Sequence, residues 1–252
     1  MKKKKNSAIL KLTNNEGDHI KTLVVVSHPD IANSQTQQFL KKGAEFMNAE
    51  WHHVEAHDKI AIEHERELLQ SADRIIFQFP LYWYAAPSGL KQWIDTVMSQ
   101  NFVYGDQQFH LADKEFGIVV TTGMPEKEFQ IGGLENITID QILAPYRALA
   151  HRAKMKVLPY FLVDQFWYKT ENQQMQLLID YQRYLDQPQP DSLTNRQEWF
   201  KNNLAKFVEN LSVNDQTTGN LIADTFEQQI EQLDQLNDTL KMIKQGEDDN
   251  LE

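Results

Sequence analysis

Residues 80–84 place a proline next to a cluster of large aromatic side chains. An apolar run ends at Pro80, and Tyr82, Trp83 and Tyr84 follow it in the loop. Large aromatic side chains are usually covered, either in a core or at an interface. Three of them at the end of a strand predict a flat wall against which a ring-shaped cofactor can lie. The alternative is that Tyr82 and Trp83 are core or dimer-contact residues, and a site at a subunit boundary would satisfy both interpretations.

A second candidate segment, 27–36, leads from a strand into the start of a helix. A helix start presents unpaired N–H groups and a partial positive charge, which suits a phosphate. The segment contains no Lys or Arg, so an anion there must be held by backbone N–H groups, by the hydroxyls of Ser34 and Thr36, and by His28. The alternative is that Ser34 simply caps its helix.

A third candidate segment, formed by Thr121, Thr122 and Gly123, ends another strand with small side chains. Small residues allow a ligand to approach the backbone closely. Backbone N–H groups at this position could stabilise negative charge that develops on a bound ring. The alternative is an ordinary turn at the end of a strand.

Several other chemistries are not indicated. His52, His53, His57 and His64 lack the i, i+4 pairing and the nearby carboxylate of zinc motifs, so no metal site is expected. The absence of cysteine excludes disulfides, thiolate ligands and cysteine nucleophiles. No Gly-x-Gly-x-x-Gly follows the first apolar run, and Gly-x-Ser-x-Gly is missing, which excludes the usual Rossmann site and the hydrolase elbow.

Strand and helix patterns alternate over the first two thirds of the chain. Short β-branched and aromatic runs predict strands, and apolar residues spaced three or four apart predict helices. The predicted strands are 22–27, 51–56, 74–79, 116–122 and 156–163. The predicted helices between them are 34–48, 62–71, 87–98 and 138–153, and Pro145 is expected to kink or split the last one.

This alternation is typical of an α/β fold, with a five-stranded parallel sheet and helices on both faces. In such folds ligands bind beyond the carboxyl ends of the strands, near the place where strand order reverses. The three candidate segments follow the first, third and fourth predicted strands. We therefore expect them to meet at one edge of the sheet and to form a single site.

The sequence changes character beyond the fifth strand, where it is polar and predicts only helices, at 170–184, 194–211 and 221–244. Apolar residues in the last of these recur every three or four positions, so this helix is expected to pack against the main domain or a partner subunit. The predicted organisation is a tail at 1–21, a main domain at 22–189 and a helical extension at 190–252.

The composition bounds the class of protein. With 252 residues, 41% of them hydrophobic, the chain is long enough for one well-buried domain with an appendage. A formal net charge of −11 argues against nucleic acid as a partner, because phosphate backbones require clustered Lys and Arg. No run is long enough to span a bilayer. The basic residues 2–5 are not followed by the apolar stretch of a signal peptide, so a cytoplasmic protein is expected.

The same residues resemble a known family. The matching segments are QFPLYWYAAPSGLKQWID at 78–95, FVYG at 102–105, TTG at 121–123, FQIGG at 129–133 and VLPYF at 157–161, preceded by His28, Pro29 and Ser34. In this order they resemble the flavodoxin-like NAD(P)H:quinone oxidoreductases, which include small bacterial members and the ancillary flavoproteins of potassium efflux systems. The resemblance covers roughly residues 22–186.

The resemblance implies a flavodoxin-like fold that binds FMN, with FAD as the alternative, usually in a homodimer whose site is built by both subunits. It implies phosphate contacts from the first segment: His28, Ser34, Gln35, Thr36 and Gln37. It implies ring contacts from the other two segments: Pro80, Leu81, Tyr82, Trp83, Thr121, Thr122 and Gly123. Two positions depart from the family pattern, which often has a second glycine at Met124 and, in some relatives, a tyrosine at Phe129.

The expected function is therefore a flavin-dependent oxidoreductase that passes hydride from NAD(P)H through bound FMN to a quinone or a similar small electrophile. Tyr82, Trp83 and Gly123 are the expected catalytic contacts, because they would order the ring and stabilise its charge. One alternative is a flavin-binding regulatory subunit of a partner protein such as a potassium efflux system, with the C-terminal helices as the contact surface. Another alternative is a one-electron carrier like flavodoxin.

Overall fold

The computed structural model describes residues 20–55, 59–105, 108–209 and 211–248. The chain divides into two compact units, the first ending at Asp186 and the second beginning at Gln187. The tail predicted at 1–21 lies almost wholly outside the described residues, as does His57.

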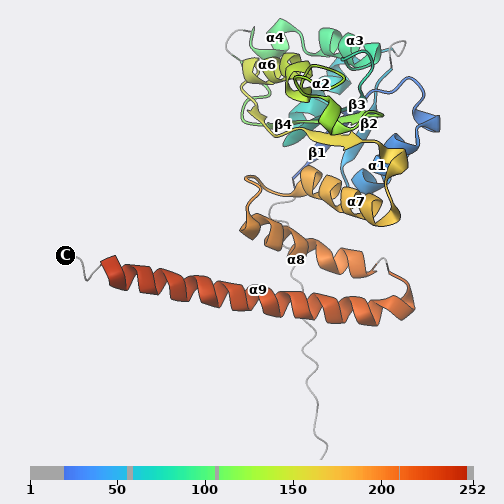
Figure 1. Ribbon diagram of the computed structural model, residues 1–252. Helices are drawn as coiled ribbons and strands as arrows, with labels where there is room; N and C mark the ends of the chain where they lie inside the picture. Colours follow the sequence, from blue (N-terminus) through green and yellow to red (C-terminus); the bar gives the residue numbers. More distant parts are fainter. Residues whose placement is uncertain (1–19, 56–58, 106–107, 210, 249–252) are drawn as a thin grey trace, which may run out of the picture. The chain divides into compact units, whose positions relative to one another are not determined.

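The first unit is built on a parallel sheet (Figure 1). In sheet order its strands are β2 (Glu50–His53), β1 (Thr22–Val26), β3 (Arg74–Pro80), β4 (Glu115–Thr122), and then β5 (Lys156–Val157) and β6 (Phe161–Asp164), which both pair with β4. All the pairings are parallel. The chain moves from β1 outward to β2 and returns to the other side of β1 as β3, so strand order reverses beside β1. The predicted α/β fold is confirmed.

The fifth predicted strand is interrupted, which corrects the expectation of one continuous strand. Val157 is level with Phe116, and Phe161 is level with Val119, so the edge uses one residue more than β4 over the same distance. Pro159 lies in this interruption and has no N–H to donate to β4. The sheet therefore has six strands where the sequence predicted five.

Helices cover both faces of the sheet (Figure 1). One face carries α1 (Gln35–Phe46) and α7 (Glu171–Asp186). The other carries α2 (Ile62–Ser71), α3 (Ser88–Val97), α5 (Ile139–Ile142) and α6 (Ala144–Arg152). Strands β1 and β3 are buried on both faces, as their continuous apolar runs require.

The predicted helix at 138–153 is split at Leu143 into α5 and α6, as the proline suggested. Pro145 stands in the first turn of α6, where its missing N–H is not needed. Among the residues that the structure describes, four short helical elements were not predicted, because they are too short to show a helical period. They are α4 (Gln100–Val103) and the 3-10 turns η1 (Ile31–Asn33), η3 (Glu126–Glu128) and η4 (Phe166–Tyr168).

Helix α7 is fastened to the sheet by hydrogen bonds in its last turns. The hydroxyl of Tyr184 accepts the N–H of Ile118 at 3.1 Å. The carbonyl of Tyr184 accepts from Arg74 at 2.6 Å, and the carbonyl of Leu185 accepts from the hydroxyl of Thr22 at 2.6 Å. Because these partners lie on β4, β3 and β1, α7 belongs to the sheet-containing unit.

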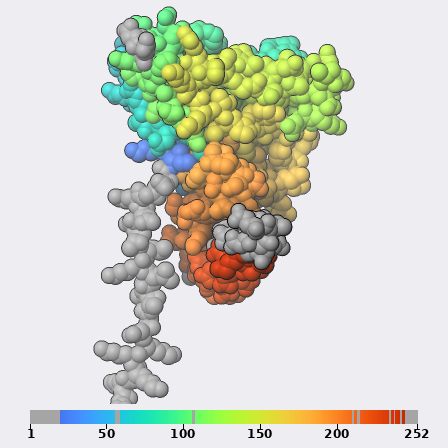
Figure 2. Space-filling view, turned by 90° about the vertical axis from the view of Figure 1, so that its left-hand side faces the viewer, coloured from blue at the N-terminus to red at the C-terminus, as the bar shows by residue number. Residues whose placement is uncertain are grey.

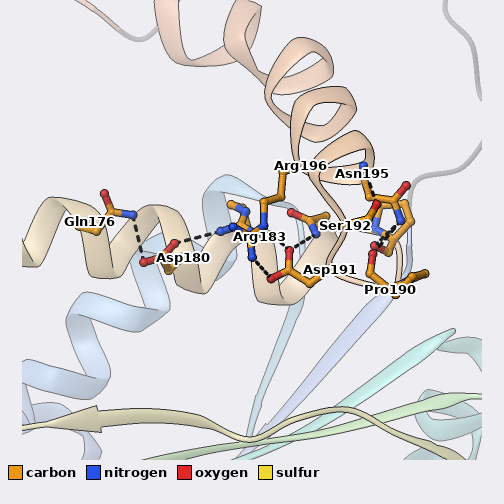
Figure 3. A network of polar contacts seen from close by, with 10 residues as sticks. Gln176, Asp180, Arg183, Pro190, Asp191, Ser192, Asn195 and Arg196 are labelled. Atoms are coloured by element: carbon orange, nitrogen blue, oxygen red, sulfur yellow. Dashed lines mark hydrogen bonds and ion pairs between the residues drawn. The ribbon is translucent and has the colours of Figure 1, made fainter. Parts of the chain in front are cut away.

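The second unit contains α8 (Leu193–Glu209) and α9 (Val213–Asp248). The hydroxyl of Ser192 accepts the N–H of Asn195 at 3.1 Å and caps the start of α8, beside an ion pair of Arg196 with Asp191 at 2.6 Å (Figure 3). Within the described residues, no helix is long and apolar enough to cross a membrane.

Helix α9 begins earlier than the predicted 221–244 and carries the predicted apolar stripe. The ring of Phe226 lies 6.2 Å from that of Phe200 in α8, so the first half of α9 pairs with α8. Further along the helix the apolar side chains are exposed, at Leu233, Leu236, Leu240 and Ile243.

Candidate cofactor site

The three candidate segments lie together at the carboxyl edge of the sheet, after the adjacent strands β1, β3 and β4. The N–H of Leu81 donates to the carbonyl of Thr121 at 2.8 Å, which joins the second segment to the third. The ring centroids of His28 and Tyr82 are 6.3 Å apart, which joins the first segment to the second. The predicted convergence of the three segments is therefore present.

The aromatic segment forms a tight two-residue turn with an unusual backbone. Tyr82 and Ala85 exchange N–H···O=C hydrogen bonds of 2.9 and 3.1 Å. Trp83 and Tyr84, between them, have φ angles of 46° and 61°. Two consecutive positive φ angles are typical of a type I′ turn, which ordinarily uses Asn and Gly. Two aromatic residues in this conformation strain the backbone, and such strain concentrates at functional sites.

This turn directs the Trp83 side chain away from the core. Trp83 is 92% exposed, and the side chains of Tyr82 and Tyr84 are also exposed. A core role for Trp83, one of the alternatives left open by the sequence, is therefore excluded. The aromatic wall is available to a ligand or to another protein chain.

His28 lies at the start of the first segment, with one ring nitrogen already engaged. Its Nδ1 accepts the N–H of Asp30 at 3.0 Å. Burial lowers the pKa of His28 below its ordinary value, and the carboxylate of Asp30 opposes this shift only in part. At neutral pH the imidazole is therefore neutral with its proton on Nε2, which can donate a hydrogen bond.

Helix α1 starts directly after Ser34, whose hydroxyl accepts the N–H of Gln37 at 3.4 Å. The capping role considered for Ser34 is thus present. Gln35 and Thr36 lie in the same first turn with accessible side chains. Their contacts to a phosphate, and that of Ser34, remain predictions.

Gln37 differs from these neighbours because its side chain is fully buried. Its Oε1 accepts from Nε2 of Gln78 at 2.6 Å. Its own Nε2 has no hydrogen-bond partner among the described residues, and neither does the buried hydroxyl of Ser27 at the other end of the segment. The Gln37 side chain therefore contacts β3, and its predicted contact to phosphate remains a prediction.

Gly123 leaves open space at the end of β4. A methyl group built on this glycine meets no described atom within 4 Å. The preceding Thr121 is buried, and the hydroxyl of Thr122 accepts the N–H of Met124 at 3.1 Å. A ligand could therefore approach the Gly123 backbone without a steric clash, as the small side chain predicted. Phe129, further along the segment, is buried in the core and offers no hydroxyl.

The segment between η3 and α5 forms a further wall of the site, and the sequence indicated its first half through the FQIGG run at 129–133. The hydroxyl of Tyr84 donates to the carboxylate of Glu135 at 2.8 Å and fixes this segment against the aromatic turn. Ile131 is 81% exposed and Leu134 is 72% exposed. Figure 2 shows the segment in lime green at the surface of the first unit. Leu134 and Glu135 were not identified from the sequence, and the signal was their place directly after this run of glycines and an apolar residue.

The histidines considered as metal ligands make other contacts. His52 Nε2 lies 2.8 Å from the carboxylate of Glu65, and His53 Nε2 lies 3.0 Å from the carbonyl of His28. Over the residues that the structure describes, no cluster of three or more potential metal ligands occurs.

A cavity of about 610 Å³ lies away from the three segments. It is lined by Ile118, Glu126, Asp140, Leu143, Arg147, Val157, Leu158, Pro159 and Tyr160. None of the predicted site residues lines it, and the guanidinium of Arg147 is ion-paired with Asp140. We assign the candidate site to the loop edge, because the three candidate segments converge there and contribute no residue to the cavity.

The three segments fit a planar ligand that carries a phosphate. The aromatic turn and the open backbone at Gly123 provide surfaces for a ring. The first turn of α1 and the neutral His28 provide hydrogen-bond donors for a phosphate. Buried polar atoms without described partners flank the same helix start, at Ser27 and Gln37.

A parallel sheet of this strand order, with its loops converging at the point of reversal, defines a flavodoxin-like α/β protein. Comparison with known families agrees, since residues 20–186 match the family model described as "Flavodoxin-like fold". The chain belongs to this family. The match ends at the last residue of the first unit and does not include α8 and α9.

Two relatives are similar to the chain over most of its first unit. It is 39% identical over 152 residues to "Uncharacterized NAD(P)H oxidoreductase YdeQ" of Bacillus subtilis, a match covering 57% of this chain and 75% of the relative. It is 33% identical over 178 residues to the "Glutathione-regulated potassium-efflux system ancillary protein KefG" of Cronobacter sakazakii, covering 69% of this chain and 95% of the relative.

Solved structures share the fold of the first unit. A structure described as an NADPH-quinone reductase from P. pentosaceus is 46% identical with a TM-score of 0.63, covering 66% of this chain and 98% of that chain. The general stress protein 14 of Treponema denticola, solved in complex with FMN, is 24% identical with a TM-score of 0.59, covering 66% and 97%.

Proposed function

We propose that this chain is a flavin-dependent NAD(P)H oxidoreductase that reduces quinones or similar small electrophiles, with FMN as its cofactor. The observation that carries the proposal is the meeting, at one sheet edge, of a strained aromatic turn, an open glycine backbone and an uncharged helix start. The names of the relatives, NAD(P)H oxidoreductase and NADPH-quinone reductase, support the reaction class. The neighbour solved with FMN supports the cofactor at the level of the fold alone.

The chain's own residues would bind and orient the reactants, while the bound flavin supplies the hydride chemistry. In this proposal Tyr82 and Trp83 cover the ring and exclude water from it, and Pro80 and Leu81 line its edge. The N–H groups of Thr122 and Gly123 stabilise negative charge on the ring, because fixed dipoles need no reorganisation when charge appears. No side chain acts as a nucleophile.

The phosphate would be held by neutral donors. His28 contributes its Nε2–H, Ser34 and Thr36 contribute hydroxyls, and the first turn of α1 contributes backbone N–H groups. A site without Lys or Arg gains less from charge attraction than a basic site. Its affinity therefore depends on how well these donors are positioned.

We propose that a second copy of the chain completes the site. Trp83, Ile131 and Leu134 leave large apolar surfaces on the loops around it, and contiguous exposed apolar surface usually marks an interface. Sedimentation of the purified protein should give twice the chain mass, and a monomer that retains turnover would contradict this part of the proposal.

A cytoplasmic location is also part of the proposal and agrees with the absence of cysteine.

The test begins with the absorption spectrum of the purified protein and identification of any nucleotide released on denaturation. We expect the yellow colour of a flavin, FMN as the released nucleotide, and oxidation of NADH or NADPH when a quinone is added. A double variant with Trp83→Ala and Ser34→Ala should lose flavin and activity while its circular dichroism spectrum stays unchanged. A colourless protein that takes up no added flavin would reject the proposal.

A second candidate function is regulation of a partner protein, with α9 as the contact surface. The exposed apolar stripe on α9, from Leu233 to Ile243, supports it. The name of one relative, a potassium-efflux ancillary protein, supports it as well. If α9 serves only a partner, replacing Leu236 and Leu240 by Asp in the full chain should leave quinone reduction unchanged. Loss of turnover in this variant would contradict a role confined to partner contact.

A further inference from the structure

A chain of three buried polar side chains crosses the apolar layer between α7 and α1. The hydroxyl of Tyr181 in α7 donates to Oε1 of Gln78 in β3 at 2.8 Å. Nε2 of Gln78 donates to Oε1 of Gln37 in α1 at 2.6 Å. All three side chains are fully buried among the apolar residues of this face. Buried polar groups are costly unless they are satisfied, so a chain of this kind fixes its members strongly.

The direction of the chain is determined from its Tyr181 end. Burial raises the pKa of Tyr181 well above its ordinary value, so the phenol stays protonated and donates. Gln78 must then turn its carbonyl oxygen toward Tyr181 and its amide nitrogen toward Gln37. Gln37 in turn accepts through its oxygen, so its orientation in the first turn of α1 depends on a residue in α7.

Gln78 holds both ends of the first candidate segment. Its side chain donates to Gln37, the third residue of α1, and its backbone carbonyl accepts the N–H of Ser27 at 3.0 Å. Ser27 stands just before His28, and Gln37 donates its own N–H to the capping hydroxyl of Ser34. The position of the helix start relative to the strand end is therefore set through one residue of the neighbouring strand.

We propose that Gln78 and Tyr181 are positioning residues for the phosphate end of the proposed flavin site. They hold the first turn of α1 so that its backbone N–H groups and the Ser34 hydroxyl converge on the phosphate. This inference rests on the proposed function, and neither residue belongs to the loops that would touch the cofactor. It matters here because the segment has no cation to compensate for misplaced donors.

The test compares FMN with riboflavin, which has the same ring system and no phosphate. Affinities of the full chain, freed of flavin, are measured by quenching of flavin fluorescence. Tyr181→Phe removes only the hydroxyl that begins the chain. Since a hydrogen bond contributes modestly on balance, we expect FMN affinity to fall about three- to tenfold. Riboflavin affinity should stay within about twofold, because the ring contacts are untouched.

Tyr184→Phe is the matched control, since it makes the same change one helical turn away. The hydroxyl of Tyr184 accepts the N–H of Ile118 and donates to the carbonyl of Pro159, and neither of these partners lies in α1. This variant should lose stability comparable to that of Tyr181→Phe, measured as a melting temperature, yet keep the wild-type ratio of FMN to riboflavin affinity. If the two variants change the ratio equally, the role of Tyr181 is merely structural and the inference is wrong.

Gln78→Met provides a second test should Tyr181→Phe fold poorly. The variant keeps the length of the side chain and the backbone bond to Ser27, but it loses both side-chain bonds of the chain. The same selective loss of FMN affinity is expected. An unchanged ratio in Gln78→Met overturns the inference while leaving the proposed function intact. A wild-type protein that binds neither flavin overturns the proposed function, and one that binds both equally shows that no phosphate site exists to be positioned.

Discussion

Replacing the two central residues of the aromatic turn with those that its backbone favours should make the protein more stable and less active. Trp83 and Tyr84 occupy the left-handed region, with φ of 46° and 61°. This conformation destabilises an L-residue by about 1–2 kcal/mol, whereas it hardly affects glycine and is readily tolerated by asparagine. The variant is the full chain carrying Trp83→Asn and Tyr84→Gly.

The expected gain in stability follows from these terms. Relief of strain at two positions stabilises the folded state by about 2–4 kcal/mol. The greater conformational freedom of glycine in the unfolded chain lowers this gain by about 0.5–1 kcal/mol. Trp83 is 92% exposed, so its removal loses little packing. Removal of Tyr84 also breaks its hydrogen bond to Glu135, a loss of about 0.5–1.5 kcal/mol. With some strain kept at the asparagine, we expect a net gain of about 1 kcal/mol, or about 2–4 °C in melting temperature for a domain of this size.

The measurements are urea and thermal unfolding of the flavin-free protein, followed by flavin affinity and quinone reduction. Trp83→Ala is the control, because alanine removes the indole but keeps a Cβ in the left-handed region, so it should bring no gain. If the double variant is no more stable than the wild type, the turn is not strained and the reasoning fails. If it gains stability and keeps full activity, the strain serves no function.

Three further changes test the rest of the site. Gly123→Ala should leave the flavin-free protein within about 0.5 kcal/mol of wild-type stability, because the space is open, but it should weaken FMN binding about tenfold in a calorimetric titration if a ring fills that space. For His28, burial lowers the pKa below 6.5, so the native state disfavours its protonation. The neutral imidazole therefore contributes its full stability at pH values above 6.5, the pKa in the unfolded chain, and this contribution is lost as the pH falls through the lower pKa of the folded state. Between pH 8 and pH 5, the free energy of unfolding should fall more in the wild type than in His28→Asn. Salt should leave FMN affinity unchanged or raise it, since a chain of net charge −11 without a cation in residues 27–36 repels the phosphate at long range; a steep loss of affinity with salt would reveal a basic contact elsewhere.

Much of this site could be predicted because it follows from strand chemistry. The apolar runs of β1, β3 and β4 require burial on both faces, which makes them neighbouring parallel strands, and parallel strands end at the same edge. That rule alone brings His28, Tyr82 and Gly123 together. The capping role of Ser34 also follows from residue type, since a serine before a helical pattern accepts a first-turn N–H.

The features that were missed depend on side-chain direction and backbone conformation. Nothing in Trp83 and Tyr84 predicts a type I′ turn, whose usual residues are asparagine and glycine. The conformation exists because the bonds between Tyr82 and Ala85 close the turn and the bond to Glu135 holds it. Tertiary contacts therefore determine this turn conformation, although the local propensities of its two aromatic residues oppose it.

Gln37 shows that a missed feature can still have a signal. It lies on the same helical face as Leu40 and Ala44, both buried, so the helical period assigned its side chain to the interior although its residue type suggested the surface. A glutamine on an apolar face must find polar partners in the core. Gln78 stands between Phe77 and Phe79 in the buried strand β3, and Tyr181 is buried on α7. Buried polar side chains on three packed elements thus form a shared hydrogen-bonded chain, because each would be costly to bury alone. The helical period and the sheet order indicate that Gln37 needs a polar partner in the core, and the structure identifies that partner as Gln78, held by Tyr181.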